Sequence, residues 1–445
     1  MNIAFVAMSG VRVQNPELLA LGLTLPSVIE RARTIAALPT LSLLTLAALT
    51  PADVEIQYVE IADVPHDLSM FDGVDLAAIS SLSAQIEEAY ALADRLRARG
   101  VRVVMGGLHV TAEPDEASEH ADAVAVGEGE LTWPRIVADF RAGALASRYA
   151  PAIDEHFDLS DAPLPRFDLL DVRRYNRLTV QTSRGCPHRC DFCAGSILLT
   201  PKYTVKPVER VIAEIRAIKR RWRRPFIEFA DDNSFAMRGH YKQLLQSLAG
   251  EGVRWFTETD ISIADDPELL DLMRDSGCRE VLIGLESPNS GGLNGIELRR
   301  NWKLGRLPSY KAAIREIQSR GIAVNGCFIL GLDGDDERVF ESVEAFANDV
   351  GLFDVQITVL TPFPGTPLYD RLKRDGRLID PRAWQKCTLF DVTYHPARMS
   401  ARDLERGVAA LAARLYAPAA VIARRAKFFD QAELRRHALS ADHDR

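Results

Sequence analysis

Short apolar segments alternate with helical patterns along most of this 445-residue chain, in two separate runs. Such alternation requires a parallel sheet, because each crossover helix returns the chain to the same end of the sheet and covers one face. We therefore expect an α/β fold whose first domain, residues 1–145, is a flavodoxin-like or Rossmann-like parallel sheet. Its strand candidates are Asn2–Met8, Val54–Ile61, Asp75–Ser83, Val101–Gly107 and Ala123–Gly127.

The second run follows a segment rich in Pro and Asp, residues 146–176, which is typical of a linker. Six strand and helix units over residues 177–369 predict a partial (β/α)6 barrel of the TIM-like kind. Residues 370–445 have a mostly helical pattern and form a C-terminal extension. The strand candidates of the barrel are Leu178–Arg184, Phe226–Ala230, Arg254–Thr259, Glu280–Glu286, Ala323–Leu330 and Asp354–Thr361.

Composition and charge exclude several classes of protein. The formal net charge of −8 argues against a nucleic-acid partner, because polyanion binding requires a concentrated positive surface. The segment Thr34–Ala52 is uncharged and approaches membrane-spanning length, but Pro39, Pro51 and several hydroxyl side chains favour a buried helix. Residues 1–8 lack the basic region of a signal peptide, so we expect a cytoplasmic protein without a transmembrane segment.

Three cysteines lie close together directly after the first strand of the second run. Cys186, Cys190 and Cys193 have the spacing Cys-x3-Cys-x2-Cys. With six cysteines in 445 residues, chance produces this spacing only about once in a thousand such chains. Three thiolates on one loop can hold three irons of a [4Fe–4S] cube and leave the fourth iron open for chemistry.

A zinc site is the alternative explanation of the same cysteines, with His188 as a possible fourth ligand. Structural zinc usually takes two pairs of ligands from separate loops. The remaining cysteines, Cys278, Cys327 and Cys387, lie far apart in the sequence and supply no second pair. The spacing therefore favours an iron–sulfur cluster.

This cysteine run resembles the signature of the radical S-adenosylmethionine (SAM) superfamily, which also places an aromatic residue, here Phe192, before the last cysteine. The resemblance implies that the three cysteines hold a [4Fe–4S] cluster and that SAM binds the open iron. It implies reductive cleavage of SAM to a 5′-deoxyadenosyl radical, which abstracts hydrogen from an unactivated carbon. It also implies an electron donor such as flavodoxin or ferredoxin.

The first domain is similar to the cobalamin-binding domain that precedes many radical SAM barrels. A Ser-x-Leu element followed by a glycine pair corresponds to that family's site for the nucleotide tail of cobalamin. Glycine lets a bulky base lie against bare backbone, and a serine can donate a hydrogen bond to it. The resemblance implies cobalamin contacts from Ser80, Ser81, Leu82, Gly106, Gly107, Gly127 and Glu128.

One element of classical cobalamin domains is absent, the motif Asp-x-His-x-x-Gly whose histidine coordinates cobalt. No such motif precedes Ser80. The lower face of the cobalt would then be bound by water, contacted by another side chain or empty. His66 and His109 are the nearest histidines in the sequence, and each is expected to be an ordinary surface or loop residue.

Carboxylates at the ends of barrel strands are the candidates for contacts to SAM. Asp231 and Asp232 follow the second strand, where the superfamily often contacts the amino group of SAM, and helix capping is the alternative role. Glu258 and Glu286 end the third and fourth strands and alternate with apolar neighbours. An inward carboxylate needs a cation or hydroxyl group nearby, which favours a polar contact to SAM.

Three further residues near the barrel mouth are expected to pack rather than to bind. Cys327 lies on a strand that resembles the superfamily's adenine-packing strand, and we expect it to be a small core residue. Tyr369 and Tyr394 are expected to be packed, with satisfied hydroxyl groups. The segment Cys387–Tyr394 resembles the C-terminal extension of cobalamin-type members, where it would cover the barrel mouth and help to select the substrate.

Together these features predict a cobalamin-dependent radical SAM enzyme that methylates an unactivated carbon, or phosphorus, of a small molecule or lipid through methylcobalamin. Cobalamin-type members that cyclise, contract or oxidise rings share the same motifs and form the first alternative. Methylthiotransferases of transfer RNA carry cysteines in the front domain, and residues 1–185 contain none. A non-catalytic cobalamin or iron–sulfur sensor is the alternative from a different class, against which the complete cysteine loop argues.

Overall fold

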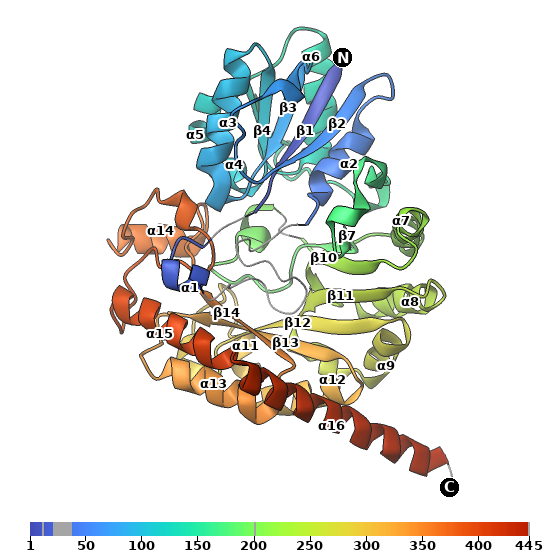
Figure 1. Ribbon diagram of the computed structural model, residues 1–445, viewed down its shortest axis with the longest axis vertical. Helices are drawn as coiled ribbons and strands as arrows, with labels where there is room; N and C mark the ends of the chain where they lie inside the picture. Colours follow the sequence, from blue (N-terminus) through green and yellow to red (C-terminus); the bar gives the residue numbers. More distant parts are fainter. Residues whose placement is uncertain (11–12, 21–37, 200–201, 444–445) are drawn as a thin grey trace.

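Two six-stranded parallel sheets follow one another along the chain. The structure is a computed structural model that describes residues 1–10, 13–20, 38–199 and 202–443. Figure 1 shows the first sheet and its helices as the upper lobe and the second sheet below it, with the C-terminal helix projecting at the lower right. The predicted α/β class, with an open sheet followed by a partial barrel, is therefore confirmed.

The first sheet has the strand order β2-β1-β3-β4-β5-β6. Its first five strands have the order of flavodoxin-like folds, in which ligands bind outside the carboxyl ends of the strands. The strands are β1 Asn2–Met8, β2 Glu55–Ile61, β3 Leu76–Ser80, β4 Arg102–Gly106, β5 Ala123–Ala125 and β6 Arg148–Tyr149. The short strand β6 pairs with β5 and lies within the segment that the sequence indicated as linker.

Helices cover both faces of this sheet, because alternate side chains of each strand are apolar on both sides. Along β1, Ile3 and Phe5 pack against α2 and α6, whereas Ala4 and Val6 pack against α3 and α5. The helices of this domain are α1 Pro16–Ala20, α2 Leu41–Leu49, α3 Ile86–Ala98, α4 Leu108–Ala112, α5 Pro114–His120 and α6 Gly129–Arg141. The sheet is a buried layer, so only its edges are free for binding.

The second sheet has the order β14-β13-β12-β11-β10-β7, and β7 and β14 each pair on one side only. It is therefore an open, partial barrel. Its strands are β7 Leu178–Val180, β10 Phe226–Ser234, β11 Arg254–Thr259, β12 Cys278–Glu286, β13 Ala323–Leu330 and β14 Asp354–Val359. A two-stranded antiparallel pair, β8 Ser183–Arg184 and β9 Thr204–Val205, lies beside the start of the barrel.

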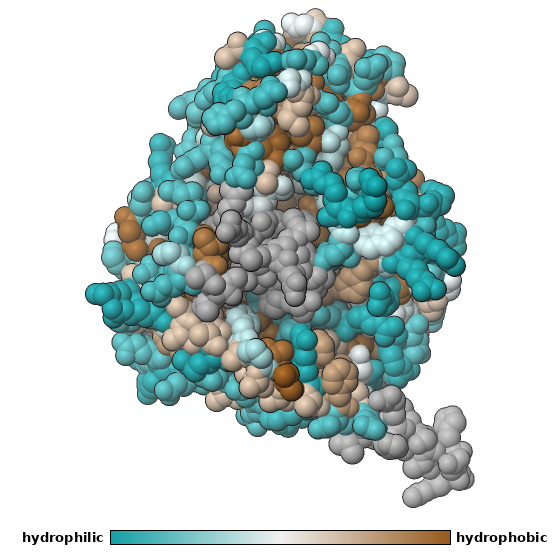
Figure 2. Space-filling model, in the orientation of Figure 1, coloured by the Kyte–Doolittle hydropathy of each residue, from teal (hydrophilic) through white to brown (hydrophobic). Residues whose placement is uncertain are grey.

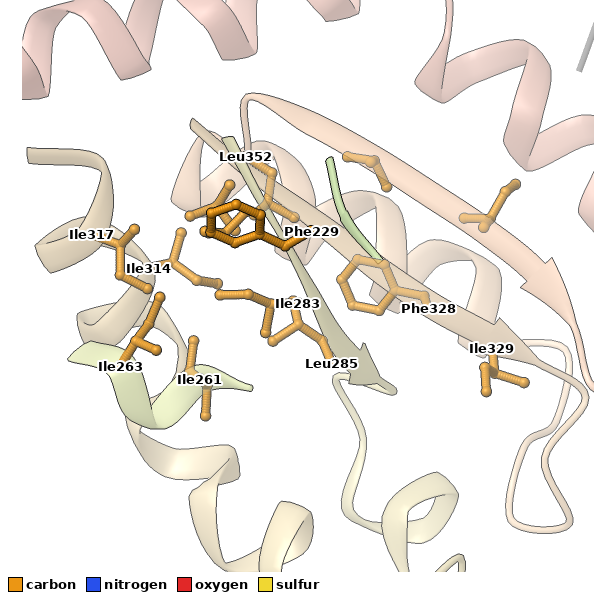
Figure 3. Close-up of a cluster of buried hydrophobic side chains, with 14 of the residues drawn as sticks. Phe229, Ile261, Ile263, Ile283, Leu285, Ile314, Ile317, Phe328, Ile329 and Leu352 are labelled. Atoms are coloured by element: carbon orange, nitrogen blue, oxygen red, sulfur yellow. The ribbon is translucent and has the colours of Figure 1, made fainter. Parts of the chain in front are cut away.

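An apolar layer fills the space between the barrel strands and the surrounding helices. Phe229, Ile283 and Leu352 belong to this layer, and Figure 3 shows them directed into one cluster with residues from the helices. The helices are α7 Val208–Arg221, α8 Arg238–Ala249, α9 Pro267–Asp275, α10 Ser290–Leu293, α11 Trp302–Arg306, α12 Tyr310–Ser319 and α13 Val339–Val350. The opposite face of the strands encloses the barrel interior, which is polar.

The C-terminal extension is mostly helical, as predicted. Its helices are α14 Pro367–Arg374, α15 Ala401–Leu415 and α16 Pro418–His443, and α15 and α16 pack on α12 and α13 (Figure 1). In the part of the chain that the structure describes, no single helix is long and apolar enough to cross a bilayer. The pair α15 and α16, bent by 60°, meets that criterion only when the two are taken together.

The uncharged segment near the N-terminus was expected to form a buried helix. Its residues 34–37 lie outside the described residues, and α2 occupies Leu41–Leu49 with Leu43, Leu44 and Ala47 buried. The helical part of the prediction thus agrees with the described residues.

Figure 2 shows that hydrophilic side chains cover most of the face in view, with apolar side chains interspersed among them.

Candidate functional site

The cysteine loop, residues 185–193, follows the first barrel strand at its carboxyl end, where barrel folds place their active sites. Gly185 opens the loop with φ +88°, and a Cβ there would lie 2.8 Å from the carbonyl oxygen of Lys202. Only glycine fits this turn without displacing backbone. Cys190 is buried, whereas Cys186 and Cys193 are partly exposed.

The cysteine loop does not form a ready-made site for a single ion. Throughout the described ranges, no three His, Cys, Asp or Glu side chains come together so that they could hold one metal ion. Zinc needs its ligands within about 2.3 Å of one point, whereas a [4Fe–4S] cube presents a separate iron to each thiolate. Burial raises the pKa of the Cys186 thiol to about 11, so the thiolate form needs a metal to stabilise it.

His188, the possible fourth zinc ligand, is engaged elsewhere. Its Nε2 lies 3.1 Å from Oδ2 of Asp260, its Nδ1 lies 3.6 Å from Oε1 of Glu297, and its ring stacks on Trp302 at 4.3 Å. Burial alone would lower the pKa of His188, but these carboxylates raise it above its ordinary value. A cationic imidazole is a poor metal ligand, so this network argues against zinc.

A buried ion pair lies next to the cysteine loop. Lys303 of α11 donates to Glu286 at the end of β12 and to the carbonyl oxygen of Gly284 at 2.9 Å. Burial would lower the pKa of Lys303, but the charges of Glu286 and Cys190 raise it. Lys303 is therefore a fixed positive charge beside Cys190, and the predicted residue Glu286 is held by it rather than free.

A cavity of about 530 Å³ lies between the first sheet and the barrel. We call it the interface cavity. The residues predicted to bind cobalamin all line it: Ser80, Ser81, Leu82, Gly106, Gly107, Gly127 and Glu128. Gly107 has φ +109°, and a Cβ there would lie 3.3 Å from Oγ of Ser80, so the glycine leaves room at the end of β4. We call the bare backbone at Gly106 and Gly107 the glycine shelf. A surface of this kind fits a large flat ligand, and the contacts with cobalamin stay a prediction.

No histidine lines the interface cavity among the described residues. His66 is exposed elsewhere on the first domain. His109 is buried, with its Nδ1 3.0 Å from Oγ of Ser83 and its Nε2 3.5 Å from Glu116. His66 is therefore the surface residue that was expected, whereas for His109 the expectation of a surface or loop position is wrong, because it is buried in α4 with polar partners. Neither histidine lines this cavity.

Arg184 connects the two domains at the wall of the interface cavity. It pairs with Glu128 and with Glu130, each at 2.6 Å, and it donates a hydrogen bond to Oε1 of Gln181 at 3.0 Å. All four side chains line the cavity. Glu128, predicted as a cofactor contact, is therefore already bound to the strand that leads into the cysteine loop.

Asp231 and Asp232, which follow Ala230 in the sequence, have different surroundings. Asp231 is buried and accepts hydrogen bonds from the backbone N–H groups of Thr182 and Ser183, at 2.7 and 2.9 Å, and from Tyr241 at 3.0 Å. These contacts argue against the predicted contact with the amino group of SAM. Asp232 instead is exposed and lines the interface cavity, and its Oδ2 accepts a hydrogen bond from the N–H of Gly185 at 2.8 Å. Both aspartates lie within β10, which continues to Ser234, rather than after the strand as predicted. Asp232 is the one that faces the cavity, and its contact with SAM stays a prediction.

The barrel interior carries polar groups on several strands. Glu228 pairs with Arg177, whereas Oδ1 of Asn325 and Oε1 of Gln356 are buried without a hydrogen-bond partner among the described residues. Glu258 is exposed on β11, and its enclosure by the barrel together with the charge of Glu228 raises the pKa of its carboxyl. Such groups can receive the polar atoms of a bound molecule, as the sequence analysis expected for Glu258.

The residues expected to pack have mixed outcomes. Tyr394 is buried and donates to the carbonyl oxygen of Gly331 at 2.5 Å, and Tyr369 is buried and donates to that of Pro381 at 3.0 Å. Both tyrosines therefore pack with satisfied hydroxyl groups. Cys327 is only partly buried and lies on the interior side of β13 opposite Gln356, so it borders the barrel interior.

The segment Cys387–Tyr394 was expected to cover the barrel mouth. The carbonyl oxygen of Leu389 accepts from the N–H of Val359 at 2.7 Å, which holds the segment beside the end of β14. Oδ1 and Oδ2 of Asp391 accept the backbone N–H groups of Asn15 and Gln14, at 2.7 and 2.9 Å. The segment therefore links the barrel to the N-terminal residues.

Sequence reasoning did not find Lys303 or Arg184 as members of the site. Neither belongs to a recognisable motif, and each is identified only by its partners, which lie 17 to 56 residues away in sequence. A buried basic residue gives no local signal of its burial, because its partners come from distant parts of the chain.

Comparison with known proteins assigns three regions of the chain. Residues 180–347 match the family model of the radical SAM superfamily, residues 37–137 match the B12 binding domain, and residues 366–443 match a domain of unknown function, DUF4070. The first two regions contain the cysteine loop and most of the interface cavity.

Relatives with assigned names are similar over most of the chain. Bacteriochlorophyllide d C-12(1)-methyltransferase of Chlorobaculum tepidum is 29% identical over 366 residues, which cover 81% of this chain and 78% of that protein. The hopanoid C-2 methylase of Rhodopseudomonas palustris is 28% identical over 350 residues, covering 77% of this chain and 66% of that protein.

Solved structures share the fold. The radical SAM methyltransferase TsrM of Kitasatospora setae, solved with cobalamin and a [4Fe–4S] cluster, has a TM-score of 0.69 at 15% identity, covering 94% of this chain and 89% of its own. The cobalamin-dependent enzyme OxsB has a TM-score of 0.66 at 14% identity, covering 91% of this chain and 65% of its own. At such identities the likeness concerns the fold.

Proposed function

Since the chain belongs to the cobalamin-dependent radical SAM enzymes, we propose that it transfers a methyl group from SAM to an unactivated carbon, or to phosphorus, of a small molecule or lipid. One observation carries this proposal. The interface cavity joins the glycine shelf at the end of the first sheet with Asp232 and Arg184 beside the cysteine loop. A molecule held on the shelf therefore faces the barrel that receives SAM.

The bound cofactors supply the difficult chemistry, in that the cluster delivers one electron for the cleavage of SAM and cobalamin carries the methyl group. The chain supplies the surroundings. Cys186, Cys190 and Cys193 hold three irons and leave one position for SAM. Lys303 places a positive charge beside Cys190, which offsets part of the negative charge of the thiolates.

Two carboxyl groups have different roles toward SAM in this proposal. Glu258, which is exposed on β11 and whose carboxyl has a raised pKa, is placed to share a hydrogen bond with a ribose hydroxyl or a ring nitrogen. Asp232, open to the interface cavity, is placed to accept from an ammonium or a hydroxyl group. Glu286 acts through Lys303, to which it is already bound.

The class of substrate rests on the relatives' names. They are named for methylation of a bacteriochlorophyllide, a hopanoid and a cytidylyl-2-hydroxyethylphosphonate. These names support a small molecule or lipid as the acceptor. One relative, 24% identical, is named an anaerobic cyclase, so non-methylating radical chemistry is the alternative that the experiment below separates.

Two further properties belong to the proposal. We place the protein in the cytoplasm, because all six cysteines are free thiols in the structure and an exposed cluster loop requires a reducing environment. We also assign it a flavodoxin or ferredoxin as electron donor, because the cleavage of SAM consumes one electron per event.

The test is anaerobic turnover of the purified protein after reconstitution with iron, sulfide and cobalamin. With SAM carrying a deuterated methyl group and a set of lipid and tetrapyrrole extracts, we expect 5′-deoxyadenosine together with one trideuteromethylated product by mass spectrometry. 5′-deoxyadenosine with an unmethylated, altered product would assign the cyclase type of chemistry instead. Formation of neither would refute an enzymatic role.

A cysteine pair provides the matched control for this experiment. Cys190→Ala removes one buried thiol from the cysteine loop and should abolish cleavage of SAM. Cys387→Ala removes a buried thiol outside the loop and should retain it. Equal behaviour of the two variants would contradict the assignment of the cluster ligands.

A further inference from the structure

An exposed group of arginines lies on the outer side of the cysteine loop. The segment 296–300, which follows β12 and α10, runs antiparallel to the loop. The N–H of Asp191 donates to the carbonyl oxygen of Ile296 at 2.9 Å, and the N–H of Leu298 donates to that of Arg189 at 2.8 Å. This pairing fixes the segment against Cys190, so the residues that follow it emerge directly beside the cluster position.

The arginines of this surface lack carboxylate partners. Arg189, Arg299 and Arg300 form no ion pair in the described part of the chain, and Arg299 and Arg300 are exposed. They border a surface hollow of about 690 Å³ that also contains Pro187 and His188 of the cysteine loop. We call these three residues the arginine face.

The carboxylates that line the same hollow already have partners within the protein. Each has a cationic or hydrogen-bonding partner within the protein: Asp260 with His188, Asp265 with Arg306, Asp266 with Lys242, and Glu297 with His188. The unpaired charges at this position are therefore positive, on a chain whose formal net charge is −8. A local positive surface on an acidic protein attracts and orients an acidic partner.

We propose that the arginine face is the docking surface for an acidic one-electron carrier protein of the flavodoxin or ferredoxin class. The inference rests on the proposed function, because only a redox cluster requires such a partner. Leu298, which is 48% exposed, lies between Arg189 and Arg299 and provides an apolar contact within a charged rim. This combination suits a folded protein better than a polynucleotide, which needs a longer basic track.

The position also suits the electron transfer itself. The reduced carrier loses one electron, and the cluster passes from the [4Fe–4S]2+ to the [4Fe–4S]+ state, so that the flavin or iron–sulfur centre of the carrier is oxidised by one electron. The arginine face belongs to the backbone pairing of residues 189–191 with residues 296–298, which includes the neighbours of Cys190, so a carrier docked there contacts the cysteine loop itself. The interface cavity and the barrel interior stay free for cobalamin, SAM and substrate.

The test compares two double variants with the same change of charge. Arg299→Glu with Arg300→Glu reverses two charges of the arginine face. The control, Arg223→Glu with Arg224→Glu, reverses two exposed arginines between α7 and β10, at the opposite end of the barrel strands from the cysteine loop. Affinity for a reduced flavodoxin is measured by titration calorimetry, and the rate of cluster reduction by anaerobic stopped-flow absorption, with the reconstituted holoenzyme.

We expect the arginine-face variant to lose about tenfold or more in affinity and in the rate of reduction at low ionic strength, and the control to change by less than about twofold. Reduction by dithionite, which needs no docking, should be equal in all three proteins. Equal losses in the two variants, or no loss in either, would overturn the proposal. Preferential binding of single-stranded RNA to the arginine face would overturn it as well.

A milder variant tests the surface without the risk that the two introduced glutamates disturb the cysteine loop. If the glutamate variant contains less iron, Arg299→Gln with Arg300→Gln is measured instead, with an expected loss of about threefold that disappears at high salt. No loss in that variant would refute the docking surface. The 5′-deoxyadenosine formed with dithionite tests the proposed function separately, because it does not depend on the carrier.

Discussion

The two sheets of this protein have equal numbers of parallel strands but use their faces differently. The first sheet is apolar on both faces and offers binding groups only at its carboxyl edge, where glycines and serines line the interface cavity. The second sheet is apolar toward its helices and polar toward the barrel interior, where Glu228 and Glu258 lie. The first domain thus binds by shape and backbone, and the second binds by charge and hydrogen bonds.

The largest effect should come from removing a buried charge of the barrel. Lys303→Met leaves Glu286 buried without its cation, which should cost about 3–5 kcal/mol of unfolding free energy. The midpoint of urea unfolding measures this loss. Lys311→Met breaks an ion pair with Asp349 in which both side chains are 52% exposed, and should cost less than about 1 kcal/mol. Similar losses of unfolding free energy in the two variants would show that burial of the ion pair does not raise its contribution to stability.

A smaller effect is expected where the two domains meet. Arg184→Gln removes the charged hydrogen bonds to Glu128 and Glu130, which should cost about 1.5–3 kcal/mol and lower the midpoint of thermal unfolding. The control is Arg173→Gln, because Arg173 pairs with Asp171 while 86% exposed. A change in Arg173→Gln as large as that in Arg184→Gln would contradict the connection between the sheets.

A methyl group added to the glycine shelf should act through shape. Gly107→Ala places a Cβ 3.3 Å from Ser80 in a left-handed backbone conformation, which should cost about 1–3 kcal/mol and reduce the cobalamin retained by the protein. Gly100→Ala has the same conformational strain, with φ +85° and no atom within 4 Å, but lies away from the cavity. Cobalamin content, measured by absorption, should fall only in the first variant, and an equal fall in both would exclude a role of the shelf.

The smallest effect concerns the pH dependence of the barrel interior, because Glu258 is exposed and solvent screens its charge. The pKa of Glu258 is raised from 4.5 to about 8, so its contribution to stability is fully present below pH 4.5 and is lost as the pH rises through 8. The melting temperature of the wild type should therefore fall relative to that of Glu258→Gln between about pH 4.5 and about pH 8, and change little above that. Parallel profiles of the two proteins would show that Glu258 is ionised throughout this range.

The fold was predictable because its elements repeat a local pattern. The predicted strands Asn2–Met8, Arg254–Thr259 and Ala323–Leu330 coincide with β1, β11 and β13. β1 and β13 are mostly apolar runs between turns, as buried parallel strands are, whereas β11 has aromatic and β-branched residues among polar ones. The strand β6 escaped prediction because two residues carry no periodicity, and only pairing with β5 defines it. Local sequence therefore determined the elements, whereas the sheet determined their ends.

The site was predictable only where its residues form local motifs. The cysteine spacing and the glycine pair Gly106 and Gly107 lie within short segments, so their positions could be recognised. The difference between Asp231 and Asp232 could not, because it depends on Tyr241 and Thr182, which approach from other parts of the chain. Polar networks between distant segments are set by tertiary packing, for which single-sequence patterns carry no information.

The pairing of Cys190 with Glu297 also has a consequence for biosynthesis. The cysteine loop leaves the ribosome about 110 residues before the segment that fixes its outer side, and at 5–20 residues per second this delay is about 5–20 s. During that interval the three thiols are held by neither their backbone partner nor the cation at Lys303. Insertion of the iron–sulfur cluster into a finished pocket must therefore wait until more than two thirds of the polypeptide has been synthesised, long after the cobalamin domain is complete.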